Sequence, residues 1–440
     1  MTIPLQFRRN ALLQRLPLYL PAALALAAAH PVWASGFQLA EQNAAGIGTA
    51  FAGAAAATND ASTVFFNPAG MADLAPGQHV TGAGSLLFRS TRFTNQGTTP
   101  MPVINPATGA PTGTTHPLGD DGGNGGGTHA IPALYYVYAP DAQWRLGMGI
   151  SPTFADETKY GDNFIGRFSA KQTSVRIINY NPSASYRISD MVTLGAGIDF
   201  ATADLKVEQT TPYGGAPVGT LKGDGHAWGY NLGVIVDLQP ATRLALTYRS
   251  SMKFDLSGTQ VVPGLISRDI SASVDMPETA SLAIRHRLNQ RTNLLADFTW
   301  TGWSRLKSIS PTVTATGAVA SAPLNFDFRD TYRVGIGGNY QLHSQWLLRA
   351  GTAYDRNPVP SDAARTMTVP DSDRIWLSLG ARNQFSERMS IDVGYAHVFA
   401  RKASTARSVT NTAQTVTLQT VRGEFKNTVD LVGVQVNYRF

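Results

Sequence analysis

The sequence predicts an all-β protein: a transmembrane antiparallel β-barrel of about 14 strands with an N-terminal, partly helical hatch in its lumen. Three observations lead to this prediction. From residue 77 to residue 440, large apolar side chains alternate with small or polar ones, which is the period of a β-strand. The second face of these segments is nearly uncharged. The connections between the segments are alternately short and long, as in outer-membrane barrels.

Composition narrows the alternatives. The chain has 440 residues, no cysteine, 42 glycines and 25 prolines. Only 15% of its residues are charged, against about 25% in ordinary soluble proteins. Its mean hydropathy of −0.11 is too polar for a bundle of membrane helices, each of which needs about 20 apolar residues. These values exclude a disulfide-stabilised scaffold, a polytopic helical membrane protein and a strongly charged disordered chain.

Residues 1–34 have the features of a secretory signal peptide. Their three arginines (Arg8, Arg9 and Arg15) precede the uncharged apolar run 16–29, and residues 32–34 offer a cleavage site. A membrane anchor is the alternative, but two prolines interrupt the run and it is too short to span a bilayer. Removing these arginines from the 36 basic residues leaves 33 against 30 acidic ones, a net charge of +3. No basic stripe then remains to suggest a nucleic-acid partner.

The predicted barrel covers residues 77–440, and its last strand shows the alternation most clearly. One face carries Val432, Val434, Val436, Tyr438 and Phe440, and the other carries Gly433, Gln435, Asn437 and Arg439. Glycine, serine, asparagine and occasional arginine also dominate the second face of the other segments, as expected of a wall around a crowded lumen. The apolar face carries aromatic residues toward its ends, as the girdles at membrane interfaces do. Because every backbone group must be paired within lipid, such a sheet has to close on itself.

The connections give the strand count. Short turns are expected near residues 141, 189–190, 239–240, 289–290, 343–344 and 386–387. Long loops are expected over 91–128, 154–172, 205–224, 255–274, 304–329, 357–372 and 401–426. These connections join about 14 strands, an even number, with the short turns in the periplasm and the long loops outside.

Residues 35–76 lack the strand pattern. The run 44–58 is uncharged and consists largely of alanine and glycine, with only Ile47 and Phe51 as bulky side chains. Its length and its glycines argue against a membrane span. Small residues of this kind suit short helices packed against another surface, so we expect residues 35–76 to form a hatch that plugs the lumen.

No enzyme signature, cofactor motif or metal-ligand spacing emerges. The motifs G-x-S-x-G and H-E-x-x-H are absent, and the start of a dinucleotide loop at residues 46–48 lacks the third glycine and the preceding strand. The histidines after residue 34 are scattered singly. Acidic residues at 156–162 and 371–373 are interpreted as solvated loop charge, with a surface divalent-ion contact as the alternative. The sequence therefore predicts no enzyme activity, no cofactor and no metal.

Several motifs resemble those of a known family. The stretches 35–39 (SGFQL) and 67–69 (NPA) lie in the predicted hatch. Further matching stretches are 160–168 (YGDNFIGRF), 181–187 (NPSASYR), 330–333 (DTYR), 348–351 (LRAG), 370–374 (PDSDR) and 376–378 (WLS). Together they cover most of the chain in the family's order. The sequence resembles the outer-membrane long-chain fatty acid transporters, the FadL-like family with its relatives that take up aromatic hydrocarbons.

The resemblance implies a barrel whose lumen is blocked by the hatch. In the family, a hydrophobic ligand is captured among external loops, passes to a pocket beside the N-terminus of the hatch and leaves sideways through the wall. The residues that would face this pocket or form the hatch turn are Gly36, Phe37, Gln38 and Leu39, and Asn67, Pro68 and Ala69. An asparagine before a proline also favours an extended turn entry, and a plain structural turn is the alternative reading of that tripeptide.

A lateral opening needs a disrupted strand, and the third predicted strand supplies candidate residues. These are Gly147, Gly149 and Pro152. Proline cannot donate to a strand ladder, and glycine weakens or kinks it. The alternative is that the glycines only give room in the lumen.

These observations lead to one functional prediction with two alternatives. We expect passive uptake of a hydrophobic small molecule, foremost a long-chain fatty acid, and its lateral release into the outer membrane of a Gram-negative bacterium. An anionic ligand would need a basic partner, for which Arg167, Lys206 and Arg333 are candidates. The alternatives are uptake of aromatic or other neutral hydrocarbons and, from another class, an adhesin or structural barrel. Further expected partners are outer-membrane lipid, lipopolysaccharide and, through the C-terminal Phe440, the barrel assembly machinery.

Overall fold

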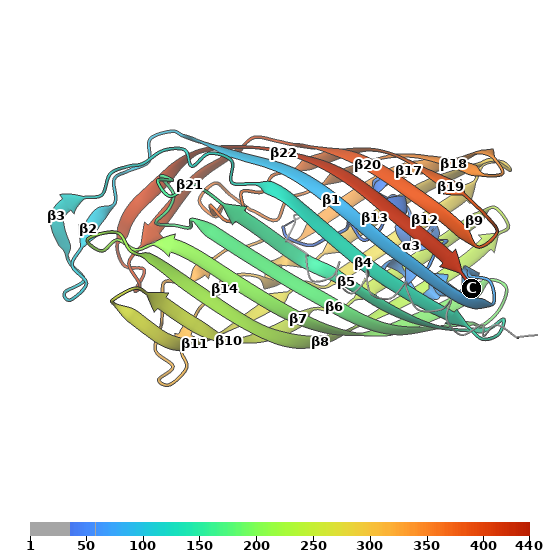
Figure 1. Ribbon diagram of the computed structural model, residues 1–440, viewed down its shortest axis with the longest axis horizontal. Coiled ribbons are helices and arrows are strands. Elements are labelled where there is room, and N and C mark those ends of the chain that lie inside the picture. Colours follow the sequence, from blue (N-terminus) through green and yellow to red (C-terminus); the bar gives the residue numbers. More distant parts are fainter. Residues whose placement is uncertain (1–35, 58) are drawn as a thin grey trace, which may run out of the picture.

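The computed structural model describes residues 36–57 and 59–440, and the predicted signal peptide of residues 1–34 lies outside them. The prediction of an all-β fold is confirmed, because fourteen antiparallel strands form a closed barrel (Figure 1). The barrel strands are β1 (Gly77–Asn95), β4 (Gly127–Ala139), β5 (Trp144–Lys159), β6 (Gln172–Arg187), β7 (Val192–Thr210), β8 (Val218–Gln239), β9 (Thr242–Arg249), β12 (Thr279–Arg287), β13 (Thr292–Thr301), β17 (Thr331–His343), β18 (Trp346–Asp355), β19 (Arg374–Gln384), β20 (Met389–Ala400) and β22 (Thr417–Arg439).

The first and last barrel strands close the wall. β1 pairs with β22 from His79 opposite Arg439 to Asn95 opposite Gly423, and it pairs with β4 along its other edge. Two further strands, β10 (Met252–Val262) and β11 (Ile266–Met276), continue β9 and β12 past short interruptions and pair with each other as a hairpin. The wall therefore extends farther on this side than the strand bounds of β9 and β12 suggest.

Three of the predicted long loops are wrong in extent, and one of them is 401–426, in which only residues 411–416 separate β21 (Ala403–Thr410) from β22. The ranges 205–224 and 255–274 are largely strand, because only residues 211–217 separate β7 from β8 and only residues 263–265 separate β10 from β11. Polar side chains on the outer face of these strands resemble loop composition, although the inner face stays apolar and the alternation continues. The other long connections contain β2 (Pro102–Ile104), β3 (Pro111–Thr115), the 3-10 helix η2 (Trp303–Arg305), β14 (Ser308–Ile309), β15 (Thr312–Val313) and β16 (Leu324–Asn325).

The two faces of the wall differ as the alternation predicts. Trp228 and Leu379 are 65% and 64% exposed on the outer face, whereas Asp392 and Gln435 are fully buried on the inner face. In a soluble protein such an exposed apolar band would be unfavourable. On a barrel it is the surface that contacts lipid.

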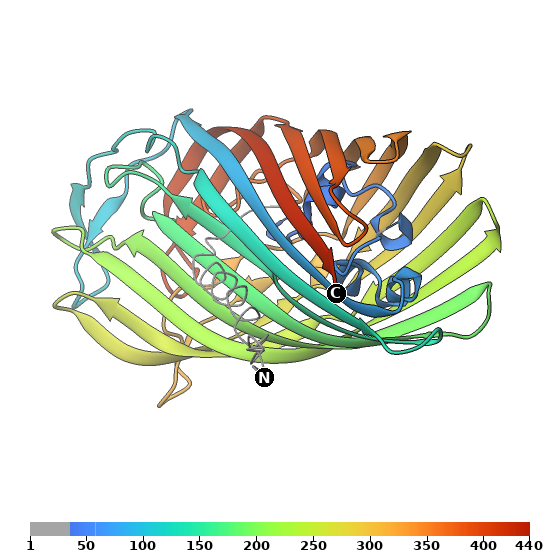
Figure 2. The ribbon, with the colours of Figure 1, turned by 45° about the vertical axis from the view of Figure 1, so that its right-hand side comes forward.

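The segment of residues 36–76, which we call the inner segment, lies inside the barrel toward its short-turn end (Figure 2). It contains α2 (Ala44–Ile47), α3 (Ala54–Ala57), α4 (Thr63–Phe66) and the 3-10 helix η1 (Pro68–Asp73). α2 packs against β19, β20 and β22, and η1 packs against β6, β7 and β8, so the segment contacts both halves of the wall. Within the described residues, every helix is too short or too polar to cross a bilayer.

Glycines on the inner face of the wall let the inner segment approach the strand backbone. A Cβ atom at Gly351 would lie 2.0 Å from the carbonyl oxygen of Thr49, and one at Gly380 would lie 2.7 Å from the Cα of Gly48. A Cβ atom at Gly195 would lie 2.2 Å from the backbone nitrogen of Ala69. The wall glycines thus form seats in which helix backbone lies directly on strand backbone.

Candidate functional site

The N-terminal end of the inner segment is hydrogen-bonded to the third barrel strand. The amide of Leu39 donates to the carbonyl of Thr153 at 2.9 Å, and the amide of Ala155 donates to the carbonyl of Phe37 at 2.9 Å. Residues 37–39 therefore form a short antiparallel bridge with β5 on the lumen side.

Gly36 fixes the start of this segment. Its amide donates to Oδ2 of Asp371 at 3.0 Å, and its φ of +68° lies in the left-handed region that favours glycine. A Cβ atom there would also lie 2.6 Å from the ring of Trp303. Burial raises the pKa of Asp371, and the neighbouring charge of Arg374 acts in the opposite direction. Both the backbone conformation and the close aromatic contact thus require glycine at position 36.

Two cavities adjoin this segment. The larger, which we call the outer cavity, has a volume of about 520 Å³ and opens among the long connections. Its apolar lining includes Val175, Leu205, Val207, Leu256, Ile270 and Phe326. The inner cavity has a volume of about 160 Å³, and its lining includes Phe51, Phe66, Phe154, Met252 and Trp376.

Phe37 stands between the two cavities. It lines the outer cavity, whereas the next two residues, Gln38 and Leu39, line the inner one. Its ring packs edge-to-face against Trp303, with the centroids 4.9 Å apart, and Trp303 is fully buried. Residues 37–39 therefore lie at the boundary between the two cavities.

Beside this segment, the neighbouring strands β4 and β5 of the described chain lack backbone hydrogen bonds to each other over part of their length. Among the described residues, β5 pairs with β4 only from Leu146 to Ile150. At the end of β5, the amide of Lys159 donates to the carbonyl of Gly125, two residues before β4 begins, at 3.0 Å. Residues 151–158 of β5 are thus without ladder partners on β4, and we call this stretch the wall gap.

The inner segment covers the wall gap from the lumen. Nε2 of Gln42 donates to the carbonyl of Pro152 at 2.7 Å, and the hydroxyl of Tyr135 on β4 donates to Oε1 of Gln42 at 3.1 Å. Arg89 of β1 forms a buried ion pair with Asp156 of β5 at 3.3 Å. Gln42 thus links the two edges of the gap through side chains, and the ion pair of Arg89 ties β5 to β1, on the far side of β4.

The residues predicted to kink the third strand have two different roles. Gly147 and Gly149 pair regularly with both neighbouring strands, and a Cβ atom at Gly147 would lie 2.5 Å from the sulfur of Met71. The glycines therefore make room for the inner segment. This agrees with the alternative stated for them, that they only give room in the lumen. The register with β6 shifts between Pro152 and Phe154, so the irregularity of β5 lies at the proline.

Asn67, Pro68 and Ala69 form a buried turn before η1. The backbone of Asn67 is extended, its Oδ1 accepts from the amide of Ala69 at 3.0 Å, and its Nδ2 donates to the carbonyl of Ala55 at 2.9 Å. The asparagine thus caps η1 and ties it to α3. Pro68 also lines the inner cavity.

Of the three basic residues singled out in the sequence, only Arg333 lines either of these cavities. It lies on the inner cavity and is ion-paired with Asp297 at 3.0 Å. Lys206 lies on the outer face of β7 and is ion-paired with Glu208 at 2.6 Å. The guanidinium of Arg167 donates to the carbonyls of residues 117 and 118, so it joins two external loops.

Arg407, which the sequence analysis did not single out, lines the outer cavity. Its Nη2 donates to the carbonyl of Asn325 at 2.9 Å, and it makes no ion pair within the described part of the chain. Burial lowers the pKa of Arg407, and the charge of Asp327 opposes this effect. A single arginine in a loop carries no sequence signal that distinguishes it from other loop arginines.

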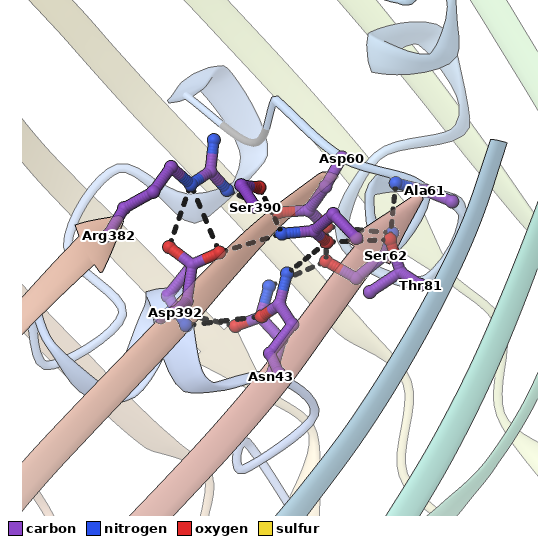
Figure 3. Close-up of polar contacts among 12 residues, drawn as sticks. Asn43, Asp60, Ala61, Ser62, Thr81, Arg382, Ser390 and Asp392 are labelled. Carbon is purple, nitrogen blue, oxygen red and sulfur yellow. Dashed lines mark hydrogen bonds and ion pairs between the residues drawn. The ribbon is translucent and has the colours of Figure 1, made fainter. Parts of the chain in front are cut away.

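A buried polar network fixes the inner segment to the wall (Figure 3). Asp392 of β20 accepts two hydrogen bonds from Nε of Arg382, at 2.9 and 3.0 Å, and Nη2 of Arg382 donates to Asp60 at 3.2 Å. Asp60 in turn accepts from the amide of Ser62 at 3.0 Å, and Asn43 donates to the Ser62 hydroxyl at 2.6 Å. Removing Arg382 would leave the buried carboxylate of Asp60 without an ion pair among the described residues, so this arginine ties the segment to the wall.

The fold and these cavities define the class of the protein: an outer-membrane β-barrel with a filled lumen and apolar internal cavities. The sequence profile of the family described as "Outer membrane protein transport protein (OMPP1/FadL/TodX)" matches residues 25–440, and the chain belongs to this family. The resemblance seen in the sequence and the predicted location in the outer membrane are thereby confirmed.

Relatives and solved structures agree with this assignment. The chain is 27% identical to the long-chain fatty acid transport protein of Escherichia coli O6:H1, over 88% of this chain and 92% of the relative. It is 27% identical to outer membrane protein P1 of Haemophilus influenzae, over 95% and 98%. The crystal structure of a Pseudomonas aeruginosa FadL homologue matches with a TM-score of 0.81 at 24% identity, covering 92% of this chain and 100% of that one. The Pseudomonas putida toluene transporter TodX matches with a TM-score of 0.65 at 15% identity, covering 92% and 100%.

Proposed function

We propose that the protein takes up hydrophobic molecules passively across the outer membrane and that long-chain fatty acids are its principal ligands. The outer cavity is the observation that carries this proposal. Its volume of about 520 Å³ lies within the roughly 300–1,000 Å³ of small-molecule sites, and its lining is largely apolar. Burial of an acyl chain there contributes about 25 cal/mol per Å² of apolar surface. The names of the relatives from Escherichia coli support the same ligand class.

The proposed path runs from the outer cavity past Phe37 to the wall gap. The ligand enters among the long connections, and the inner segment acts as the hatch, which closes the lumen to polar solutes. Movement of residues 37–39 then opens the way to the unpaired edges of β4 and β5. Release there delivers the ligand sideways into hydrocarbon, so it never crosses an aqueous lumen.

Arg407 is the proposed partner of the carboxylate. It is a partly desolvated guanidinium on the wall of an apolar cavity and lacks an ion-pair partner among the described residues. A charge-assisted hydrogen bond to a carboxylate offsets the cost of desolvating such a guanidinium. Arg333 already has a carboxylate partner in Asp297, so it is the weaker candidate of the two.

Uptake of neutral hydrocarbons is the second candidate. The charged residues that line the outer cavity are balanced, with Asp156 and Asp327 against Lys222 and Arg407. A balanced lining does not exclude an uncharged ligand. Comparing uptake of labelled oleate and labelled hexadecane by the same cells separates the two candidates, because only the fatty acid carries a carboxylate.

The test is uptake by a strain that lacks its own fatty acid transporter. We expect the wild-type protein to restore oleate uptake, and Ala272→Trp, which fills the outer cavity, to lower it about tenfold. Ser273→Trp is the matched control, because Ser273 is exposed on the outer face of β11, and it should leave uptake unchanged. No uptake above the empty vector with either substrate would refute the proposed function.

A further inference from the structure

Basic side chains gather on the outer face of the wall where its first and last strands meet. Arg92 of β1 lies directly opposite Lys426 of β22, and both side chains are exposed. Arg422 follows on the same face of β22, and Lys402 lies in the link that precedes β21. We call these four residues the seam cluster.

The seam cluster is only partly neutralised. Glu424 pairs with Lys402 at 2.7 Å. The side chains of Arg92, Arg422 and Lys426 make no ion pair or hydrogen bond within residues 36–57 and 59–440. Like charges directly opposite each other on neighbouring strands are destabilising. The arrangement therefore favours an anionic group from outside the chain.

The height of the seam cluster on the barrel identifies the region of the membrane that it meets. The apolar belt of such a barrel is about 25 Å tall with strands tilted about 35–45°, so it takes roughly ten residues of strand at about 3.4 Å per residue. Counted from Tyr438 at the periplasmic end of β22, ten residues reach Thr428. Lys426 is the next residue on the outer face. The cluster thus stands at the external interface, and Ser90, Thr428 and Asp430 separate it from exposed apolar residues such as Phe88 and Val432.

Basic residues at a comparable height on β6 and β7 differ from the seam cluster in their pairing. At the corresponding outer face of β6 and β7, Arg176 is ion-paired with Asp204 at 3.0 Å and Lys206 with Glu208 at 2.6 Å. The charges there neutralise one another within the chain. The three cations of the seam cluster that are unpaired among the described residues are thus free to meet an anionic group, whereas Arg176 and Lys206 already have carboxylate partners.

We propose that the seam cluster binds the phosphate groups of lipopolysaccharide in the outer leaflet. The lipid fits both parts of this surface, because its phosphates lie at the level of the basic residues and its acyl chains lie against the apolar face below. Basic clusters beside a membrane recognise anionic headgroups in this way. The site is on the outside of the wall and is independent of the cavities and of the proposed transport.

The test is binding of purified lipid A to the purified barrel, measured by native mass spectrometry. The triple variant Arg92→Gln, Arg422→Gln, Lys426→Gln should bind bisphosphorylated lipid A about 100-fold more weakly than the wild type. The control variant Arg176→Gln, Lys206→Gln, Lys253→Gln removes as many cations from the outer face of β6, β7 and β10 and should stay within about twofold of the wild type. Heat-modifiable migration on gels reports whether each variant is folded.

A second measurement leaves the protein unchanged. Wild-type protein should bind dephosphorylated lipid A as weakly as the triple variant binds the bisphosphorylated form, and added salt should weaken only the phosphorylated complex. Equal binding of the two lipids to the wild type would overturn the proposal. Equal loss of binding in both triple variants would overturn it as well, because it would show a non-specific charge effect.

Discussion

Arg407 is the single residue that we propose as the partner of a ligand carboxylate in the outer cavity. We predict that Arg407→Gln weakens oleate binding about tenfold, because the neutral amide loses a charge-assisted hydrogen bond, and leaves hexadecane binding unchanged. Binding to the purified barrel is measured by displacement of a fluorescent fatty acid. Arg167→Gln is the matched control, since Arg167 joins external loops outside this cavity. Equal loss for both ligands would argue against a carboxylate contact.

Glu41 is a buried residue of the inner segment whose carboxylate oxygens make no hydrogen bond within the described residues. Burial raises its pKa from an ordinary value of 4.5 to about 7, although the nearby backbone amides of residues 40 and 41 and the charge of Arg374 oppose the shift. The folded protein therefore holds this proton more tightly than the unfolded chain does. Stability contributed by the neutral carboxyl is present at low pH and is lost as the pH rises from about 4.5 to 7.

We predict that Glu41→Gln removes this pH dependence, because an amide does not titrate. The wild type and the variant should unfold with similar free energies near pH 4.5, and the variant should be more stable near pH 8 by on the order of 3 kcal/mol. Thermal unfolding of the detergent-solubilised barrel across this pH range measures the difference. Parallel pH profiles of the two proteins would contradict the prediction.

β5 carries the one irregularity on which the proposed exit depends. Its register with β6 holds one extra residue, Thr153, and its pairing with β4 stops at Ile150. We predict that deleting Thr153 together with Pro152→Ala makes the strand regular, closes the wall gap and abolishes oleate uptake while the barrel still folds. Pro152→Ala alone keeps the extra residue and should retain most of the uptake. Wild-type uptake by the deletion variant would show that ligands leave by another route.

At the scale of secondary-structure elements, the sequence predicted the features that a two-residue alternation of side chains indicates, namely strands and their two faces. The stripe that ends in Phe440 predicted the outer face of β22, and the connections predicted the number of strands. The extent of β7 and β10 was missed, because polar outer-face residues such as Lys206 and Asp255 resemble loop composition. The contacts of Gly147 were left open, since alternation shows which face a glycine occupies and not what packs against it.

At the scale of the molecule, the sequence predicted the fold better than the candidate site, because alternation does not show what packs against a residue. Residues 36–39 were singled out by resemblance, and the structure brings them between two cavities. Arg407 and Glu41 carried no local signal, because their significance comes from burial that residues far along the chain provide. Local patterns thus predicted the barrel, whereas long-range packing created the site.

The inner-face glycines let the inner segment pack directly against the backbone of the barrel wall. We predict that Gly351→Leu displaces the inner segment, because a Cβ atom there would lie 2.0 Å from the Thr49 carbonyl, and makes the barrel leak polar solutes. Entry of a polar chromogenic β-lactam should approach that of a barrel lacking residues 36–76. Gly84→Leu is the control, since nothing lies within 4 Å of a Cβ atom at Gly84. A tight Gly351→Leu barrel would show that the segment does not seal the lumen.

The seat of α2 also has a consequence for biosynthesis. α2 is among the first parts of the described chain to be synthesised, yet it packs against β19, β20 and β22, which are among the last. Until β22 pairs with β1, this helix has only part of its seat and the lumen remains open along one side. Seating of the segment and closure of the seam are therefore a single late event, in which the barrel is completed around its own N-terminal residues.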